Sequence, residues 1–302
     1  NNAKYASKDG VLYGKDKDGV LVTVLYCPIM NTPAGGKFVV PETVTRIETG
    51  AFAYNRGIEK IEFNNSGENL TFGEKVFASC EGLKEITLPK GMTVIGVSMF
   101  EGCTSLEKVY IPNTVVSIQQ AAFRTCSSLT TIEFEQGGEN DLVIEDSESK
   151  GGPPVNQGVF SGTSSLKEIT FPERTTRIGN YAFAVTDLNG NPELPEKQSG
   201  VKTLNLPSTL KEIGTGVFYY NYNLTTINYA KNIQLESIGM QSFSNAKGIR
   251  SITIPASVKK IGDGLFSGAS NLKEITFENG SQLTSIPRTM FATCSSLEKI
   301  KI

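Results

Sequence analysis

Histidine and tryptophan are both absent from this 302-residue sequence. Without histidine the chain can form no Ser-His-Asp triad, no Cys-His pair and no zinc site of the HExxH type. It also has no apolar run approaching the roughly 18 residues of a membrane span, which argues against direct membrane insertion. An excess of either charge is missing as well, because 29 basic and 31 acidic side chains give a net charge of −2. That balance argues against nucleic acid as a principal partner.

What the sequence has instead is an internal repeat anchored by phenylalanine. Ten phenylalanines recur at nearly constant spacing: Phe52, Phe77, Phe100, Phe123, Phe160, Phe183, Phe218, Phe243, Phe266 and Phe291. Successive members are 23 or 25 residues apart, except after Phe123 and Phe183, where the gaps are 37 and 35 residues. The spacing predicts a repeat solenoid of about ten units of about 23 residues, with two insertions.

Further apolar columns keep the same register as the phenylalanines. Five residues before each one stands an apolar residue, which in the unit of Phe160 is Val155. Nine and eleven residues after it come apolar pairs such as Ile86 and Leu88. Alternation with a period of two predicts one short strand per unit with one buried face. The segment around each phenylalanine is too brief for a regular helix, so we expect short 3-10 or helical turns there.

Residues 106–126 read Leu-Glu-Lys-Val-Tyr-Ile-Pro-Asn-Thr-Val-Val-Ser-Ile-Gln-Gln-Ala-Ala-Phe-Arg-Thr-Cys. This is nearly the whole unit of the BspA-type leucine-rich repeat, L-x-x-I-x-I-P-x-x-V-x-x-I-G-x-x-A-F-x-x-C, which the chain resembles over about residues 38–302. The resemblance implies a leucine-rich-repeat solenoid, a right-handed superhelix rich in β-structure. Residues 1–37 are similar to the preceding cap of this family, and segments 11–13 and 20–26 predict a β-hairpin that covers the first strand edge.

The resemblance also implies a function, because proteins of this family are commonly secreted or surface-anchored in bacteria and are associated with adhesion. It implies a non-catalytic, adhesin-like binding scaffold that is secreted or at the cell surface, its signal peptide removed. The implied partner is an extracellular protein (a host matrix or plasma protein, or another bacterial surface protein) or a glycan. A carbohydrate-binding or polysaccharide-associated surface protein is the alternative. An enzyme that uses acidic residues of an insertion is the least favoured interpretation, since paired carboxylates need a rigid cleft.

A cluster of tyrosines is the first candidate binding surface. Tyr219, Tyr220 and Tyr222 follow an anchor phenylalanine at positions where most units carry smaller residues. Tyrosine combines a large apolar body with a polar tip and is enriched at binding hot spots. We expect these three side chains to contact a partner or a carbohydrate, and packing against the neighbouring unit is the alternative. Tyr229, close behind them, belongs to the core column.

The outward residues of the strands form the second candidate, the concave face of the sheet. The residues that we expect to contact a partner there are Tyr110, Thr170, Asn205, Asn228 and Thr253. A broad polar face without a deep apolar pocket suits a macromolecule better than a small substrate. The same residue types also occur on any solvent-facing sheet, so an ordinary solvated face is the alternative.

The two insertions provide the third candidate. The first, near residues 135–154, is acidic and includes Glu139, Asp141, Glu145 and Asp146, while residues 142–144 predict an additional strand. It is either an acidic recognition loop or weak cation site, or a solvated loop that long surface connections allow at small cost. The second, near residues 187–200, is polar and interrupted by proline and glycine.

Catalytic residues, cofactors and metal sites are not expected. Four of the five cysteines lie three residues after an anchor phenylalanine: Cys80, Cys103, Cys126 and Cys294. The sequence has no C-x-x-C pair, and stacked cysteines lie about one strand spacing apart, farther than the roughly 3.8 Å between the Cβ atoms of a disulfide. We predict buried free thiols, with a regulated disulfide or a metal site as the alternative. Asp16–Gly19 lacks the closing glutamate of a calcium loop and is interpreted as a hairpin turn.

Overall fold

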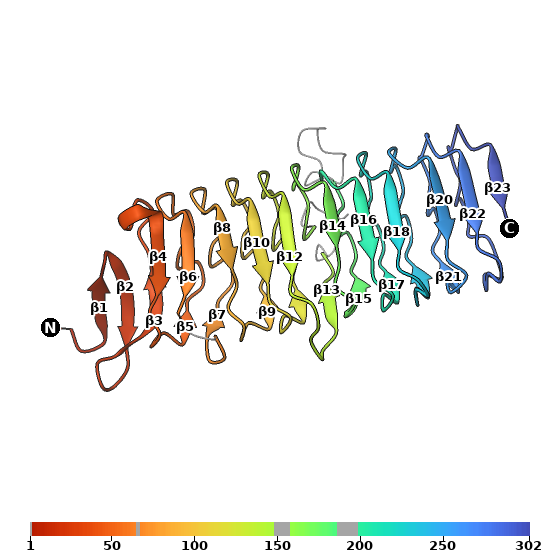
Figure 1. Ribbon diagram of the computed structural model, residues 1–302. Helices are drawn as coiled ribbons and strands as arrows, with labels where there is room; N and C mark the ends of the chain where they lie inside the picture. The colour runs from red at the N-terminus through yellow and green to blue at the C-terminus, as the bar shows by residue number, and fades with distance from the viewer. Residues whose placement is uncertain (1, 65–66, 148–157, 186–198) are drawn as a thin grey trace.

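The computed structural model describes residues 2–64, 67–147, 158–185 and 199–302. Their strands stack side by side along an elongated solenoid, from the N-terminal to the C-terminal end (Figure 1). The β-solenoid predicted from the repeat is therefore confirmed. Nothing in the described part of the chain forms a helix long and apolar enough to span a bilayer.

Each unit contributes a strand to a first row of parallel strands. The first row consists of β4 (Lys37–Val40), β6 (Lys60–Phe63), β8 (Glu85–Thr87), β10 (Lys108–Ile111), β12 (Thr131–Phe134), β14 (Glu168–Thr170), β16 (Thr203–Leu206), β18 (Thr226–Tyr229), β20 (Ser251–Ile254), β22 (Glu274–Phe277) and β23 (Lys299–Lys301). The row forms three sheets, from β4 to β12, from β14 to β18 and from β20 to β23. Within each sheet equivalent residues of neighbouring units are paired, as for Val109, whose partners are Ile86 and Ile132. The alternation that predicted the strands is visible in β10, where Val109 and Ile111 are buried and Tyr110 faces outward.

A second row lies behind the first and consists of shorter strands. Its members are β3 (Leu21–Tyr26), β5 (Arg46–Ile47), β7 (Thr71–Phe72), β9 (Val94–Ile95), β11 (Ser117–Ile118), β13 (Leu142–Ile144), β15 (Thr175–Ile178), β17 (Glu212–Ile213), β19 (Ser237–Ile238) and β21 (Lys260–Ile261). Along this row an apolar residue of each strand points inward. Examples are Ile95, Ile118 and Ile213, which are all fully buried. The two rows thus enclose one continuous core.

The N-terminal hairpin expected within residues 1–37 is present. β1 (Tyr5–Lys8) and β2 (Val11–Lys15) are antiparallel, and β2 continues into β3 through a turn. In that turn the Asp16 carboxylate accepts hydrogen bonds from the N–H groups of Asp18 and Val20, both at 2.9 Å. β3 then pairs in parallel with β5, so the hairpin covers the end of the second row. In the described part of the chain the first row begins at β4, whose strand partner is β6.

The ten anchor phenylalanines form one stack through the core. Neighbouring rings are stacked, with centroids 4.8 Å apart for Phe160 and Phe183 and 6.2 Å apart for Phe266 and Phe291. All but Phe291 are fully buried. Burying a phenylalanine is worth about 1.5–3 kcal/mol, and stacking adds to this, so the column is a principal source of cohesion between units.

The segments that carry the phenylalanines are consecutive turns and not the short helical pieces that we expected. The 3-10 helix that the structure does contain, within the described residues, is Ala34–Gly36 in the cap. Residues with positive φ, such as Ser79 at 55° and Ser98 at 53°, interrupt the right-handed conformation that a helix needs. The backbone instead bonds to the next unit, since Phe77 N–H donates to Met99 O at 3.0 Å and Phe100 N–H to Ala122 O at 2.8 Å.

The structure corrects the register around the first insertion. Ile144 pairs with Ile118 on one side and Ile178 on the other, so it takes the column position that we had assigned to Val155. Val155 lies outside the described residues. The additional strand predicted at residues 142–144 is present as β13. Of the second insertion, the structure describes only Ser199 and Gly200, whose N–H donates to Thr163 O at 3.0 Å.

Candidate binding surfaces

A ladder of polar side chains crosses the outer face of β14, β16 and β18. The Asn205 amide donates to Thr170 Oγ1 at 2.8 Å and to Glu168 Oε1 at 2.7 Å. The Asn228 amide donates to Asn205 Oδ1, also at 2.8 Å. The ladder forms because Thr170, Asn205 and Asn228 are paired residues of adjacent strands. Thr170 and Asn228 are exposed and Asn205 is half-buried. Three of the five residues expected on this face are thus brought together.

Tyr110 lies on the same face but in the earlier sheet. Lys108 Nζ donates to its hydroxyl at 2.8 Å and lies 5.1 Å from its ring centroid, and it also pairs with Glu133 at 3.3 Å. The hydrogen bond to Tyr110, followed by the one to Glu133, raises the pKa of Lys108. Tyr110 and Glu133 line a shallow groove of about 270 Å³. The Tyr110 ring is therefore partly covered by its own neighbours.

Thr253, the fifth of these residues, lines a second groove, which lies between β18 and β20 and extends to β22. This groove has a volume of about 600 Å³. Its lining is mostly hydroxyl, amide and carboxylate, and includes Asn228, Tyr229, Thr253, Glu274 and Glu278. The sequence predicts a face without a deep apolar pocket but does not locate this polar groove, because periodicity gives the order of the strands and not whether neighbouring strands pair.

The three tyrosines predicted to bind a partner form one aromatic cluster. Tyr219 and Tyr220 are packed edge to face with ring centroids 4.5 Å apart, and Tyr220 meets Tyr222 in the same way at 6.4 Å. All three are half-buried. Burial, with a smaller contribution from Tyr220, raises the pKa of Tyr219 to about 12. We name Tyr219, Tyr220 and Tyr222 the tyrosine cluster.

Two residues that sequence reasoning missed extend the tyrosine cluster. Lys247 from the next unit places its Nζ 5.0 Å from the ring centroid of Tyr222. Tyr181 from the preceding unit lies on the other side, where its ring packs on Gly216 so closely that a Cβ there would overlap it. A signal was available for Lys247, because it occupies in its own unit the place that Tyr222 occupies, four residues after the anchor phenylalanine.

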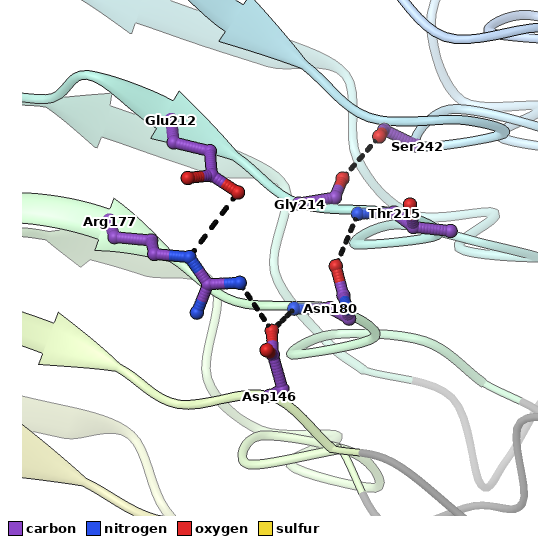
Figure 2. Close-up of polar contacts among 7 residues, drawn as sticks. All are labelled: Asp146, Arg177, Asn180, Glu212, Gly214, Thr215 and Ser242. Atoms are coloured by element: carbon purple, nitrogen blue, oxygen red, sulfur yellow. Dashed lines mark hydrogen bonds and ion pairs between the residues drawn. The ribbon is translucent and has the colours of Figure 1, made fainter.

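The acidic residues of the first insertion do not form a common site. Glu139 and Asp141 are exposed, whereas Glu145 accepts a hydrogen bond from Ser117 Oγ at 2.9 Å. Asp146 accepts from Arg177 and from the N–H of Asn180, both at 2.6 Å (Figure 2). Glu145 and Asp146 therefore lie along the second row and hold neighbouring units together. Glu139 and Asp141 are the acids that remain open to a partner.

The polar contacts of Asp146 continue along the second row (Figure 2). Arg177 Nε lies 3.3 Å from Glu212, and the Asn180 side chain accepts a hydrogen bond from Thr215 N–H at 2.7 Å. Ser242 in the following unit donates to Gly214 O at 2.6 Å. These contacts reach from β13 to the turn after β19, and their chemistry is that of structural cross-links between units.

The cysteines are free in this structure, as predicted. The thiol of each column cysteine donates to the carbonyl of the previous unit's phenylalanine, for example from Cys103 to Phe77 at 3.0 Å and from Cys126 to Phe100 at 3.0 Å. Burial raises the pKa of both thiols, so both stay protonated at neutral pH. Across the described residues no cluster of histidine, cysteine, aspartate or glutamate is arranged to hold a metal ion.

Comparison with known proteins identifies the repeat. A family model for the BspA type leucine rich repeat region, of six copies, matches residues 30–141, 152–198 and 196–302. No curated protein matches the sequence. Similar solved structures include a leucine-rich repeat protein of T. pallidum, with 20% identity over 89% of this chain and 91% of that chain and a TM-score of 0.48.

Two further structures are similar over nearly the whole chain. A leucine rich cell surface protein from Faecalibacterium prausnitzii A2-165 shares 20% identity over 100% of this chain and 95% of that chain, with a TM-score of 0.41. The pneumococcal vaccine antigen PcpA shares 15% identity over 99% of this chain and 87% of that chain, with a TM-score of 0.38. Leucine-rich repeat proteins are generally non-catalytic scaffolds that mediate protein interactions. The chain belongs to the BspA-type leucine-rich repeat family.

Proposed function

We propose that this protein is a non-catalytic, adhesin-like scaffold, secreted or held at the bacterial cell surface, that binds an extracellular macromolecule. The partner is a host matrix or plasma protein or another bacterial surface protein, and the contact is centred on the tyrosine cluster. The observation that carries the proposal is the packing of three tyrosine rings against one another while each stays half-exposed.

The fold does not require large aromatic residues at these positions. The next unit has Ser244 and Asn245 where this unit has Tyr219 and Tyr220, and it forms the same turn. Because the rings already restrict one another, little side-chain entropy remains to be lost when a partner covers them. Aromatic anchors of this kind, with polar tips, are typical of binding hot spots.

The polar ladder of β14, β16 and β18 supplies a second contact region. It offers amide and hydroxyl groups to a partner that also covers the tyrosines. A polar region of this breadth favours an extended protein interface and not a small-molecule pocket. Glu139 and Asp141 remain candidate contacts for a basic partner. Their participation is separable from that of the tyrosine cluster, because both lie two units earlier in the sequence.

The test is binding of the purified chain to immobilised host matrix proteins, plasma proteins and glycans at physiological salt. A triple variant, Tyr219→Ser with Tyr220→Asn and Tyr222→Ser, is preferable to alanine because Tyr220 has a φ of 58°, which asparagine accepts. Residues of these types stand at the equivalent positions of other units. Tyr54→Ser is the matched control, since Tyr54 has the same backbone conformation, a φ of 64°, and is 63% exposed without belonging to the cluster.

We expect saturable binding to a protein, weakened about tenfold or more by the triple variant and unchanged by Tyr54→Ser. Binding that survives the triple variant would reject the tyrosine cluster as the contact. A glycan hit that depends on the same tyrosines would select the carbohydrate alternative. Absence of binding to every protein and glycan of the panel would contradict the proposed partner classes.

A further inference from the structure

The first row of strands is interrupted twice in the described part of the chain, between β12 and β14 and between β18 and β20. The groove of about 600 Å³ lies at the second interruption. In the described part of the chain β18 pairs with β16 and β20 pairs with β22, and the two strands do not pair with each other. The second row runs on without a break through β17, β19 and β21 (Figure 1). The turns that carry Phe218 and Phe243 also stay joined, since the N–H of Phe218 donates to the carbonyl oxygen of Ser242 at 2.8 Å. The solenoid is therefore open on one side only.

A backbone hydrogen bond that recurs within the sheets of the first row is missing at both interruptions. The residue before β18, Thr225, donates its N–H to Lys202 O at 3.0 Å, and Lys273, before β22, donates to Arg250 O at 2.7 Å. Arg250 itself stands in the equivalent position before β20. Its N–H has no such bond to Thr225 O, although the structure describes both residues. Two strand edges thus face each other without the contacts that join all their neighbours.

The side chains at the break distinguish it from the paired strands of the first row. Tyr229 stands in a column that carries Leu206 in the unit before and Ile254 in the unit after, both fully or almost fully buried. Tyrosine is larger than either, and its hydroxyl is buried without a hydrogen-bond partner. Pro207 and Pro255 end the two neighbouring strands, whereas Ala230 follows β18. Side-chain size and the missing proline do not separate the strands by themselves, because Phe63 before Asn64 and Phe277 before Glu278 occupy the same column in strands that pair on both sides. What distinguishes β18 is the buried hydroxyl of Tyr229, which has no hydrogen-bond partner.

We propose that the groove between β18 and β20 binds an extended peptide as an additional strand. Unpaired strand edges are recognised by another backbone, whose N–H and C=O groups complete the ladder. The groove volume of about 600 Å³ lies within the roughly 300–1,000 Å³ of ligand sites. This inference rests on the proposed function, because it names a class of partner for the same scaffold, but it assigns the contact to a different surface.

The charges of the groove specify the kind of peptide. Two carboxylates line it, those of Glu274 and Glu278, and no lysine or arginine does. Glu274 is paired with Lys301, and Glu278 accepts a hydrogen bond from Ala256 N–H at 2.9 Å. A basic peptide can compete for these acids, whereas an acidic peptide would be repelled. The expected occupant is therefore an extended, basic segment of a partner protein.

The probe is a labelled synthetic peptide with the sequence of residues 247–256, capped at both ends. It copies β20, a strand that the first row accepts, and carries two basic side chains from Lys247 and Arg250. Fluorescence anisotropy with the full chain should show saturable binding. Methylation of the peptide nitrogens at the positions of Ser251 and Thr253 should weaken binding about tenfold or more, because it removes two backbone donors.

Variants of the chain locate the site. Tyr229→Leu should let β18 and β20 pair and should abolish peptide binding, while Leu206→Ile, in the same column but between paired strands, should leave it unchanged. Hydrogen exchange gives a measurement that needs no variant. The Arg250 amide should exchange faster than that of Thr225 in the free protein and slow down about tenfold or more when the peptide is bound.

The proposal is overturned if the peptide does not bind, if the methylated peptide binds equally well, or if Tyr229→Leu binds as the parent does. It is also overturned if a neutral oligosaccharide is retained in the groove and the peptide is not. Binding to the matrix and plasma panel is measured separately. Panel binding that persists in Tyr229→Leu alongside failure of the peptide would reject this groove alone and leave the tyrosine cluster standing.

Discussion

The guanidinium of Arg177 lies 2.6 Å from the carboxylate of Asp146, across two neighbouring strands of the second row (Figure 2). The pair is only partly exposed, with 24% of the Arg177 side chain and 33% of the Asp146 side chain accessible. The same carboxylate accepts the N–H of Asn180, so one acid holds both a side chain and the backbone of the following unit. The geometry gives Asp146 a structural role at the unit that precedes residues 148–157.

Asp146→Ala should lower the free energy of unfolding by about 1–3 kcal/mol, because it removes the acceptor of the Asn180 N–H and of one Arg177 nitrogen, while Glu212 stays beside the guanidinium. Urea denaturation at neutral pH measures the change. Glu139→Ala is the control, since Glu139 is an exposed acid of the same segment, and its effect should stay within about 0.5 kcal/mol. Equal losses in the two variants would contradict the role assigned to Asp146.

The repeat was predictable because a position that is apolar in every unit can be recognised as buried from the sequence alone. An apolar residue that recurs in register at Phe100, Phe123 and their equivalents can be placed in the core without knowledge of any contact. The role of Asp146 could not be found this way, because its partners lie 31 and 34 residues along the chain and belong to no column. The register error at Val155 has the same origin, since an insertion lets two apolar residues compete for one place.

Of the candidate surfaces, one could be predicted from the sequence and one could not. The tyrosine cluster was predictable because its residues are close in sequence and depart from the pattern of other units. The groove between β18 and β20 was not, because it depends on whether two strands pair, and Tyr229 fits the apolar column well enough to be placed in the core. A tyrosine in a column that otherwise carries aliphatic residues and phenylalanine is the signal that such a groove leaves in the sequence.

The phenylalanine stack should be least tolerant at its centre. Phe123 is fully buried, with Phe100 at 5.5 Å and Phe160 at 5.8 Å from its ring centroid. Phe123→Ala should therefore lower the free energy of unfolding by about 3–5 kcal/mol. Phe291→Ala should cost clearly less, because Phe291 is half-buried and stacks on Phe266 alone at 6.2 Å. Thermal unfolding of both variants compares them, and a larger loss for Phe291→Ala would be evidence against the stack as the main cohesive element.

The buried thiols should be unreactive in the folded protein. Burial raises the pKa of Cys103 and Cys126, and because the thiolate is the reactive form, both should resist a thiol reagent at pH 8. Cys294 is half-buried and should react first. In denaturant all five cysteines should titrate, and a count below five would show that a disulfide or another modification is present.

Alkaline pH should test the environment of the tyrosine cluster. The pKa of Tyr219 is raised to about 12 by burial and by Tyr220. Below about pH 10 tyrosine is protonated in both the folded and the unfolded chain, so this residue gives no pH dependence there. Between about pH 10 and 12 only the unfolded chain loses the proton, so stability should fall as the pH rises. Ultraviolet titration should show one fewer late-ionising tyrosine in Tyr219→Phe, and an unchanged number would contradict the assignment.

Tyr229→Phe should stabilise the protein, an unusual direction for a substitution at a buried site. The hydroxyl of Tyr229 is buried without a hydrogen-bond partner, and burial, with the nearby charge of Glu278, raises its pKa, so it remains a neutral and unsatisfied donor. Removing it while keeping the ring should raise the free energy of unfolding by about 1 kcal/mol.

The matched variant is Tyr110→Phe, which removes a hydroxyl that accepts a hydrogen bond from Lys108 at 2.8 Å, and which should leave stability unchanged or slightly lower. A stability loss in Tyr229→Phe would mean that the hydroxyl has a partner, such as an ordered water. Phe277 occupies the same column in a strand that pairs on both sides, so Tyr229→Phe should also let β18 and β20 pair and weaken peptide binding. Loss of binding in both variants would assign the gap to the polar tip of Tyr229, whereas binding that survives in Tyr229→Phe would assign it to the ring.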